Sequence, residues 1–134
     1  MNKYTVKEKT ITQKIYTTCD GSEFTNKQYA YDHAAHLFTE DVLENTTNTI
    51  DIDSSLFTHE YITSWKFSNK NELDMFLYGF LDAYEMYNEE EIKDEAQNRT
   101  SFPCTLCATE NEIFFKEDFI EKIENILNMI KEDL

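Results

Sequence analysis

Residues 61–84 read YITSWKFSNKNELDMFLYGFLDAY, and this stretch decides the fold because it joins the clearest strand pattern to the clearest helix pattern. In residues 61–67, aromatic and β-branched side chains alternate with other residues, which is typical of a half-buried strand. Asn69 and Glu72 stand at the spacing of a capping box, so we expect a helix to begin there. The apolar positions that follow recur as on one helix face: Leu73, Phe76, Leu77, Phe80, Leu81 and Tyr84.

The sequence before this stretch adds a second helix and weaker strand signals. Residues 3–19 are rich in Thr, Ile, Tyr and Val with rough alternation, which predicts one or two strands. Thr25 and Gln28 repeat the capping-box spacing, and apolar residues recur at helical spacing through residues 30–42, so a helix is expected there. Residues 46–60 are compatible with a short edge strand and with an exposed loop, and both interpretations stay open.

The last third of the chain predicts a loop and a terminal helix. Pro103 interrupts the regular pattern, and the loop expected there carries Cys104 and Cys107. Apolar residues then follow helical spacing: Phe119, Ile120, Ile123, Ile126, Leu127 and Ile130. The sequence therefore predicts one α+β domain over residues 1–134, with about three helices packed on a short antiparallel sheet of two to four strands.

The charge of the chain is strongly negative and unevenly distributed. The net charge is −15 on 134 residues, and 23 acidic residues against seven basic ones follow residue 39. Such an excess destabilises the compact state through self-repulsion, so we interpret it as a binding surface. The simpler alternative is that the acidic helices are only solvated surfaces.

Two acidic stretches dominate this excess, because no basic residue lies between Lys27 and Lys66 or between Lys70 and Lys93. On a continued helix, Asp82, Glu85 and Glu89 would place like charges on one face. We expect these rows of carboxylates to face a basic groove much as phosphates do. The first candidate binding residues are Asp82, Glu85, Glu89, Glu90, Glu91, Asp94 and Glu95, and the second set is Asp41, Glu44, Asp51 and Asp53.

The short length, the acidic clusters at residues 40–60 and 82–95, and the single arginine resemble a class of proteins rather than one sequence family. Small acidic proteins of phages and mobile elements that block host defence nucleases are similar, among them anti-CRISPR and anti-restriction proteins that mimic DNA. The resemblance implies a non-enzymatic inhibitor in the host cytoplasm. Its partner would be a basic CRISPR or restriction nuclease, bound in the nucleic-acid groove or at the site for the short motif that flanks the target.

The cysteines suggest an alternative, a zinc-stabilised regulatory or adaptor module with a merely solubilising acidic surface. Cys104 and Cys107 form a Cys-x-x-Cys pair, Cys19 is a third possible thiolate, and a histidine would complete a tetrahedral zinc set. A strong zinc signal needs two such pairs, and the commoner role of free cysteines is that of small buried apolar residues.

Other function classes find little support in the sequence. No phosphate loop, zinc-protease motif or calcium loop surrounds the acidic pairs, so we expect no enzymatic activity. No apolar run approaches the length of a membrane helix, and we expect no membrane partner. The lysines at positions 3, 7, 9 and 14 form only a thin basic strip, so direct nucleic-acid binding is disfavoured. That strip could instead contact the acidic face of a homodimer or of the partner.

Overall fold

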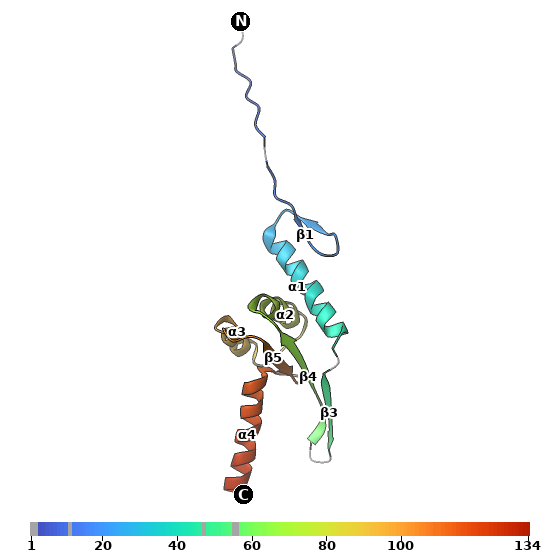
Figure 1. Ribbon diagram of the computed structural model, residues 1–134, viewed down its shortest axis with the longest axis vertical. Coiled ribbons are helices and arrows are strands. Elements are labelled where there is room, and N and C mark those ends of the chain that lie inside the picture. Colours follow the sequence, from blue (N-terminus) through green and yellow to red (C-terminus); the bar gives the residue numbers. More distant parts are fainter. Residues whose placement is uncertain (1–2, 11, 47, 55–56) are drawn as a thin grey trace.

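The computed structural model describes residues 3–10, 12–46, 48–54 and 57–134 and shows the predicted α+β fold (Figure 1). Within these ranges the elements are β1 (Tyr16–Thr17), β2 (Glu23–Phe24), α1 (Lys27–Glu44), β3 (Thr49–Ser54), β4 (Phe57–Phe67), α2 (Lys70–Ala83), α3 (Glu89–Gln97), β5 (Cys104–Ala108), β6 (Ile113–Phe115) and α4 (Lys116–Asp133). The strands form a two-stranded sheet, β1-β2, and a four-stranded antiparallel sheet with the order β3-β4-β5-β6. Of the helices described, none is long and apolar enough to cross a bilayer.

The core lies between the four-stranded sheet and α2, the two elements that residues 61–84 predict. Trp65 and Phe67 on β4 are buried, and their ring centroids lie 5.0 and 4.9 Å from that of Phe76 on α2. Phe76 also stacks on Phe80 at 5.3 Å. Burial of each such ring stabilises the fold by about 1.5–3 kcal/mol, so this aromatic cluster anchors the helix to the sheet.

Helix α1 packs closely against α2 at Thr39 and Gly79. The Thr39 hydroxyl is buried and donates to the Ala35 carbonyl at 2.8 Å. A Cβ atom on Gly79 would overlap that hydroxyl, so only glycine allows the two helices to approach this closely.

The capping patterns predict one helix start correctly and miss the other by one residue. Asn69 accepts a hydrogen bond from the Glu72 amide at 2.9 Å, which confirms the start of α2. At α1, however, the N-cap is Asn26 rather than Thr25, and its side chain accepts from the Tyr29 amide at 3.1 Å. Asparagine is at least as good an N-cap as threonine, which explains the shift.

The strands differ from the prediction in two places and decide one alternative that the sequence left open. In the N-terminal region only Tyr16–Thr17 is a strand, and residues 3–10 and 12–15 form none. The edge-strand interpretation of residues 46–60 is confirmed by β3. The loop expected at Cys104 and Cys107 is wrong, because both residues lie on β5. Pro103 precedes that strand, where its missing amide removes no ladder hydrogen bond.

The acidic helix surface predicted from residue 82 onward is interrupted by a turn. Helix α2 ends at Ala83, and α3 begins only at Glu89. The turn is fixed by Asn88, a buried side chain that donates to the Ile113 carbonyl at 2.6 Å and accepts from the Ile113 amide at 3.0 Å. Asp82, Glu85 and Glu89 therefore do not share one helix face, and that prediction is wrong.

Helix α4 departs most from the expected packing of three helices on the sheet. Its first turns lie near β5 and β6, where Phe119 stacks on Phe114 with ring centroids 5.9 Å apart. Beyond these turns α4 projects from the body (Figure 1), and none of its residues is buried. Ile126 and Ile130 remain 59% and 50% exposed, so the apolar stripe of this helix covers no core.

Candidate protein-binding surface

Seven of the predicted binding residues surround the turn from α2 to α3, and we call them the acidic corner. Three of them occupy the first turn of α3, where the free amides and the helix dipole favour negative charge, so they also stabilise the helix. The acidic corner comprises Asp82 on α2, Glu85 in the connection, and Glu89, Glu90, Glu91, Asp94 and Glu95 on α3.

Two members of the acidic corner have cationic partners that the sequence analysis did not predict. Glu89 Oε1 lies 2.8 Å from Lys93 Nζ, a pair one helical turn apart on α3. Asp82 Oδ2 lies 2.8 Å from His36 Nε2, a contact made only when α1 packs on α2. These two carboxylates are therefore compensated locally, although no lysine or arginine lies within the two acidic stretches.

His36 links the end of α2 to the middle of α1. Its Nδ1 atom lies 2.6 Å from the Asp32 carbonyl oxygen, and its Nε2 atom lies 2.8 Å from the Asp82 carboxylate. Both partners are acceptors, so both ring nitrogens donate and the imidazolium form is favoured. The hydrogen bond to the Asp32 carbonyl, followed by the one to Asp82, raises the pKa of His36 above its ordinary value.

The other members of the acidic corner have little compensation. In the described parts of the chain, Glu85, Glu90, Glu91 and Asp94 are exposed, and none of them forms an ion pair. Their charges therefore act on the surroundings largely unneutralised, screened only by solvent and salt.

Glu95 meets another carboxylate rather than a cation. Partial burial, and then the hydrogen bond and charge of Asp118 on α4, raise the pKa of Glu95 to about 7, and Glu91 adds to the effect. Burial and nearby negative charge both disfavour the ionised form of a carboxyl group, so both act in the same direction here. The second turn of α3 and the first turn of α4 thus bring acidic side chains to one groove.

The single arginine of the chain lies beside this charge without neutralising it. Arg99 forms an ion pair with Glu117, and its guanidinium lies over the Phe115 ring at 4.6 Å from the centroid. Arg99, Glu95 and Asp118 line one groove of about 420 Å³. Arg99 therefore stabilises the start of α4.

The second set of predicted acidic residues lies elsewhere. Asp41 and Glu44 are exposed near the end of α1, and Asp51 and Asp53 lie on β3. Helix α2 lies between α1 and α3 (Figure 1). The predicted carboxylates therefore form separate groups on different elements, and only the acidic corner brings many of them together.

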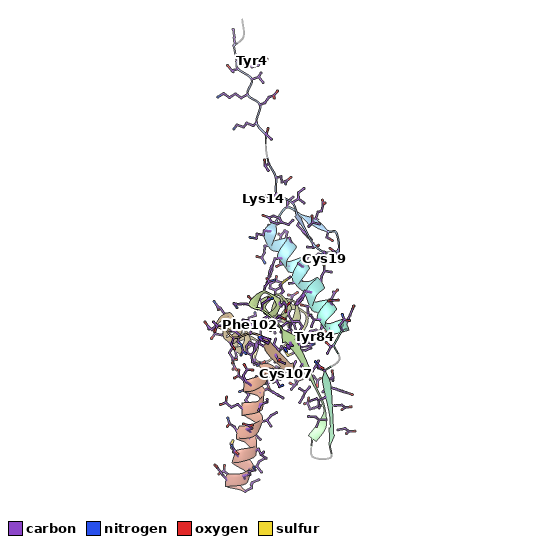
Figure 2. All side chains as sticks on the ribbon, in the orientation of Figure 1. Tyr4, Lys14, Cys19, Tyr84, Phe102 and Cys107 are labelled. Carbon is purple, nitrogen blue, oxygen red and sulfur yellow. The ribbon has the colours of Figure 1, made fainter. Side chains whose placement is uncertain are left out.

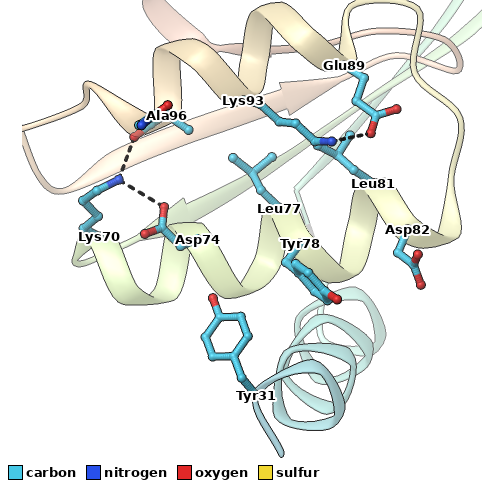
Figure 3. Close-up of a pocket in the computed structure, with 11 residues that line it drawn as sticks. Tyr31, Lys70, Asp74, Leu77, Tyr78, Leu81, Asp82, Glu89, Lys93 and Ala96 are labelled. Carbon is cyan, nitrogen blue, oxygen red and sulfur yellow. Dashed lines mark hydrogen bonds and ion pairs between the residues drawn. The ribbon is translucent and has the colours of Figure 1, made fainter. Parts of the chain in front are cut away.

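A pocket of about 540 Å³ lies between α1, α2 and α3, beside the acidic corner (Figure 3). Lys70 Nζ lies 2.8 Å from the Ala96 carbonyl oxygen and 3.2 Å from Asp74 Oδ1. Tyr31 and Tyr78 meet edge to face, with ring centroids 5.8 Å apart. Both lysines of this pocket pair with acids of their own helices, and Lys70 also joins α2 to α3 through the Ala96 carbonyl.

The zinc set predicted from Cys19, Cys104 and Cys107 is not formed. Cys19 is exposed near the β1-β2 turn, whereas the other two are buried on β5. Cys104 faces the helical core, and Cys107 lines a groove on the opposite face of the sheet, because residues three apart on a strand point in opposite directions. Among the residues with described positions, no group of three histidine, cysteine or acidic side chains could hold a metal ion.

The exposed stripe of α4 is a candidate binding feature that the sequence analysis missed. The stripe consists of Ile120, Ile123, Ile126, Leu127 and Ile130. Its spacing was visible in the sequence, but a core-facing helix has the same spacing, so periodicity alone could not reveal that the stripe is uncovered. Contiguous exposed apolar surface of this kind is typical of protein-binding sites.

No protein-family model, curated protein or solved structure matches the chain.

Proposed function

We propose that this protein is a non-enzymatic inhibitor that binds a basic nucleic-acid-binding protein and excludes DNA from it. The specific candidate is a host CRISPR or restriction nuclease. The observation that carries the proposal is the group of exposed carboxylates at the acidic corner, where Glu85, Glu90, Glu91 and Asp94 form no ion pair with any described residue. A cationic groove that binds phosphates would supply the missing compensation.

The exposed members of the acidic corner would provide the long-range part of the interaction. Unneutralised carboxylates steer a cationic partner toward the site and raise the association rate, most strongly at low salt. The expected signature is an affinity that falls as the salt concentration rises.

The apolar stripe of α4 would provide the short-range part. Charge pairs at the rim of an interface contribute little to affinity, whereas desolvated apolar side chains at its centre contribute more. Ile126 and Ile130 are exposed on a helix whose first turn carries Asp118, so apolar and acidic groups lie on one continuous element. A partner with a basic groove beside an apolar cleft would match both features.

The proposal also predicts a proton exchange on binding. A lysine or arginine placed next to Glu95 and Asp118 would lower the pKa of Glu95, so binding near neutral pH would release a proton. Titration calorimetry with a guide-loaded Cas9-type nuclease, repeated in buffers of different ionisation enthalpy, would measure that release.

Two matched charge reversals test which acidic surface binds. E90K/D94K changes two exposed acids one turn apart on α3, and E40K/E44K changes two exposed acids with the same spacing on α1. We expect E90K/D94K alone to weaken binding to a panel of purified CRISPR and restriction nucleases. If every panel member binds both variants as it binds the wild type, or if only E40K/E44K binds less tightly, the assignment to the acidic corner is wrong.

A further inference from the structure

The first residues of the chain form an exposed basic segment that leaves the body. Residues 3–10 and 12–15, which we call the arm, are exposed throughout and extend away from β1 (Figure 1). Figure 2 shows the arm from Tyr4 to Lys14 apart from the rest of the molecule. The arm carries four lysines and one glutamate, whereas the remainder of the chain is strongly acidic.

The sequence of the arm alternates as a strand would. In an extended conformation, Lys3 and Lys7 lie on one face, while Tyr4 and Val6 lie on the other. Tyr4 and Val6 are 78% and 74% exposed, so nothing in this structure uses that apolar face.

Strand β3 offers an edge with the complementary pattern. It lies at the end of the four-stranded sheet, next to β4 only. The Ser64 amide donates to the Asn48 carbonyl at 2.9 Å, so alternate residues from Asn48 onward bond to β4. The backbone groups of Thr49 and Asp51 consequently point outward, where an added strand could bond to them.

The two faces of β3 also match those of the arm. Ile50 and Ile52 line a groove of about 770 Å³ between the sheet and the start of α4. Asp51 alternates with them on the opposite face of the sheet, and Asp53 is exposed beside the irregularity in strand pairing between Ile52 and Ser54.

We propose that the arm of one copy of this protein adds as an antiparallel strand to β3 of a second copy. A register with Tyr4 opposite Ile52 and Val6 opposite Ile50 extends the apolar face and also sets Lys3 beside Asp53. Main-chain hydrogen bonds give such strand addition its affinity, and the alternating side chains give it specificity.

The occupant is a second copy because the arm and β3 carry opposite charges and lie at opposite ends of the molecule. The arm starts at β1, before α1, and runs away from β3, which follows the far end of α1 (Figure 1). Two strongly acidic bodies repel each other, and the lysines of the arm place positive charge at the point of contact.

Charge-reversing substitutions on the arm and on β3 test the association. Sedimentation velocity of the full-length protein measures the fraction of dimer. We expect concentration-dependent dimerisation of the wild type that weakens with salt. Deleting residues 1–13 should abolish it, and K3E/K7E or D53K should each weaken it by about tenfold or more. Combining K3E/K7E with D53K should restore it, and circular dichroism checks that each variant is folded. A wild type that stays monomeric, a dimer that survives the deletion, or a D53K variant that dimerises normally overturns the proposal.

An intermolecular disulfide tests the register. In a C19S background, which removes the exposed cysteine, V6C/I50C pairs residues that would face each other, whereas T5C/I50C pairs residues of opposite faces. We expect mild oxidation to cross-link the first variant into dimers and to leave the second monomeric. Equal cross-linking of both variants, or of neither, contradicts the register and with it the site on β3.

Discussion

Glu95 on α3 and Asp118 on α4 line one groove, where partial burial and then the Asp118 carboxylate raise the pKa of Glu95 to about 7. Burial and a neighbouring carboxylate both disfavour the charged form, so Glu95 binds a proton more readily than a free glutamate does. The pair connects the acidic corner to the helix whose apolar stripe is exposed. The charge at this junction therefore changes with pH near neutrality.

The first prediction concerns the effect of this pair on stability. The pKa of Glu95 is about 7 in the folded protein and 4.5 ordinarily, so the folded chain binds this proton to a higher pH than the unfolded chain. The stabilisation is therefore complete below pH 4.5 and is lost as the pH rises toward 7. E95Q places an amide of the same shape at this position and does not titrate. Urea unfolding should show that the stability of E95Q falls less than that of the wild type between about pH 5 and pH 8. Identical pH profiles would refute the raised pKa of Glu95.

The second prediction concerns His36. Its pKa is raised above 6.5, so its contribution to the free energy of unfolding is present below that pH and is lost as the pH rises through the folded pKa. H36Q should lower the melting temperature at about pH 5.5 and much less at about pH 9, with a loss of at most about 1 kcal/mol because the pair is largely exposed. H33Q serves as the comparison, since His33 pairs with Asp20 rather than with an acid of α2. An H36Q deficit that is constant with pH would show that His36 acts only by packing.

The third prediction tests the contact between α1 and α2. G79A places a methyl group where the Thr39 hydroxyl lies, so it should reduce the free energy of unfolding by about 1–3 kcal/mol. A83S, at an exposed position of the same helix, should change it by less than about 0.5 kcal/mol. Equal effects of the two substitutions in urea titrations would mean that the helices do not approach closely at Gly79.

The fold could be predicted where local pattern and tertiary packing agree. Trp65 and Phe67 alternate on a strand, and Phe76 and Phe80 recur on a helix, because each set faces the same core. The turn at Asn88 was missed, since the sequence around it is as acidic and helix-compatible as α3 itself. Only its hydrogen bonds to Ile113 reveal the break, and these join residues 25 positions apart.

The candidate site was predicted in composition but not in geometry. The carboxylates of α3 were identified, whereas the ion pair of Asp82 with His36 and the meeting of Glu95 with Asp118 were not. Each of these contacts joins helices whose relative placement no local spacing encodes. For the same reason, the sequence could not show that Cys104 and Cys107 point to opposite faces of one strand.

The fourth prediction separates the role of α4 in binding from any role in folding. Because Ile126 and Ile130 are exposed, I126E/I130E should change the free energy of unfolding by less than about 0.5 kcal/mol. F76A, which empties a core position, should cost about 3–5 kcal/mol. If α4 docks on a partner, I126E/I130E should also reduce nuclease binding although it remains as stable as the wild type. A marked drop in its melting temperature would show that the stripe is buried within the molecule.

The most direct measurement is a competition between this protein and target DNA for binding to a nuclease. The enzymes are a guide-loaded Cas9-type nuclease and a panel of restriction nucleases. Electrophoretic mobility shift of the DNA monitors the competition at increasing salt concentrations. We expect the wild type to displace DNA from one of these enzymes, with an affinity that decreases as salt increases. E90K/D94K should reduce that displacement by about tenfold or more, and E40K/E44K should leave it within about twofold. Displacement that is insensitive to salt and unaffected by E90K/D94K would contradict the account, as would a failure to displace DNA from any enzyme tested.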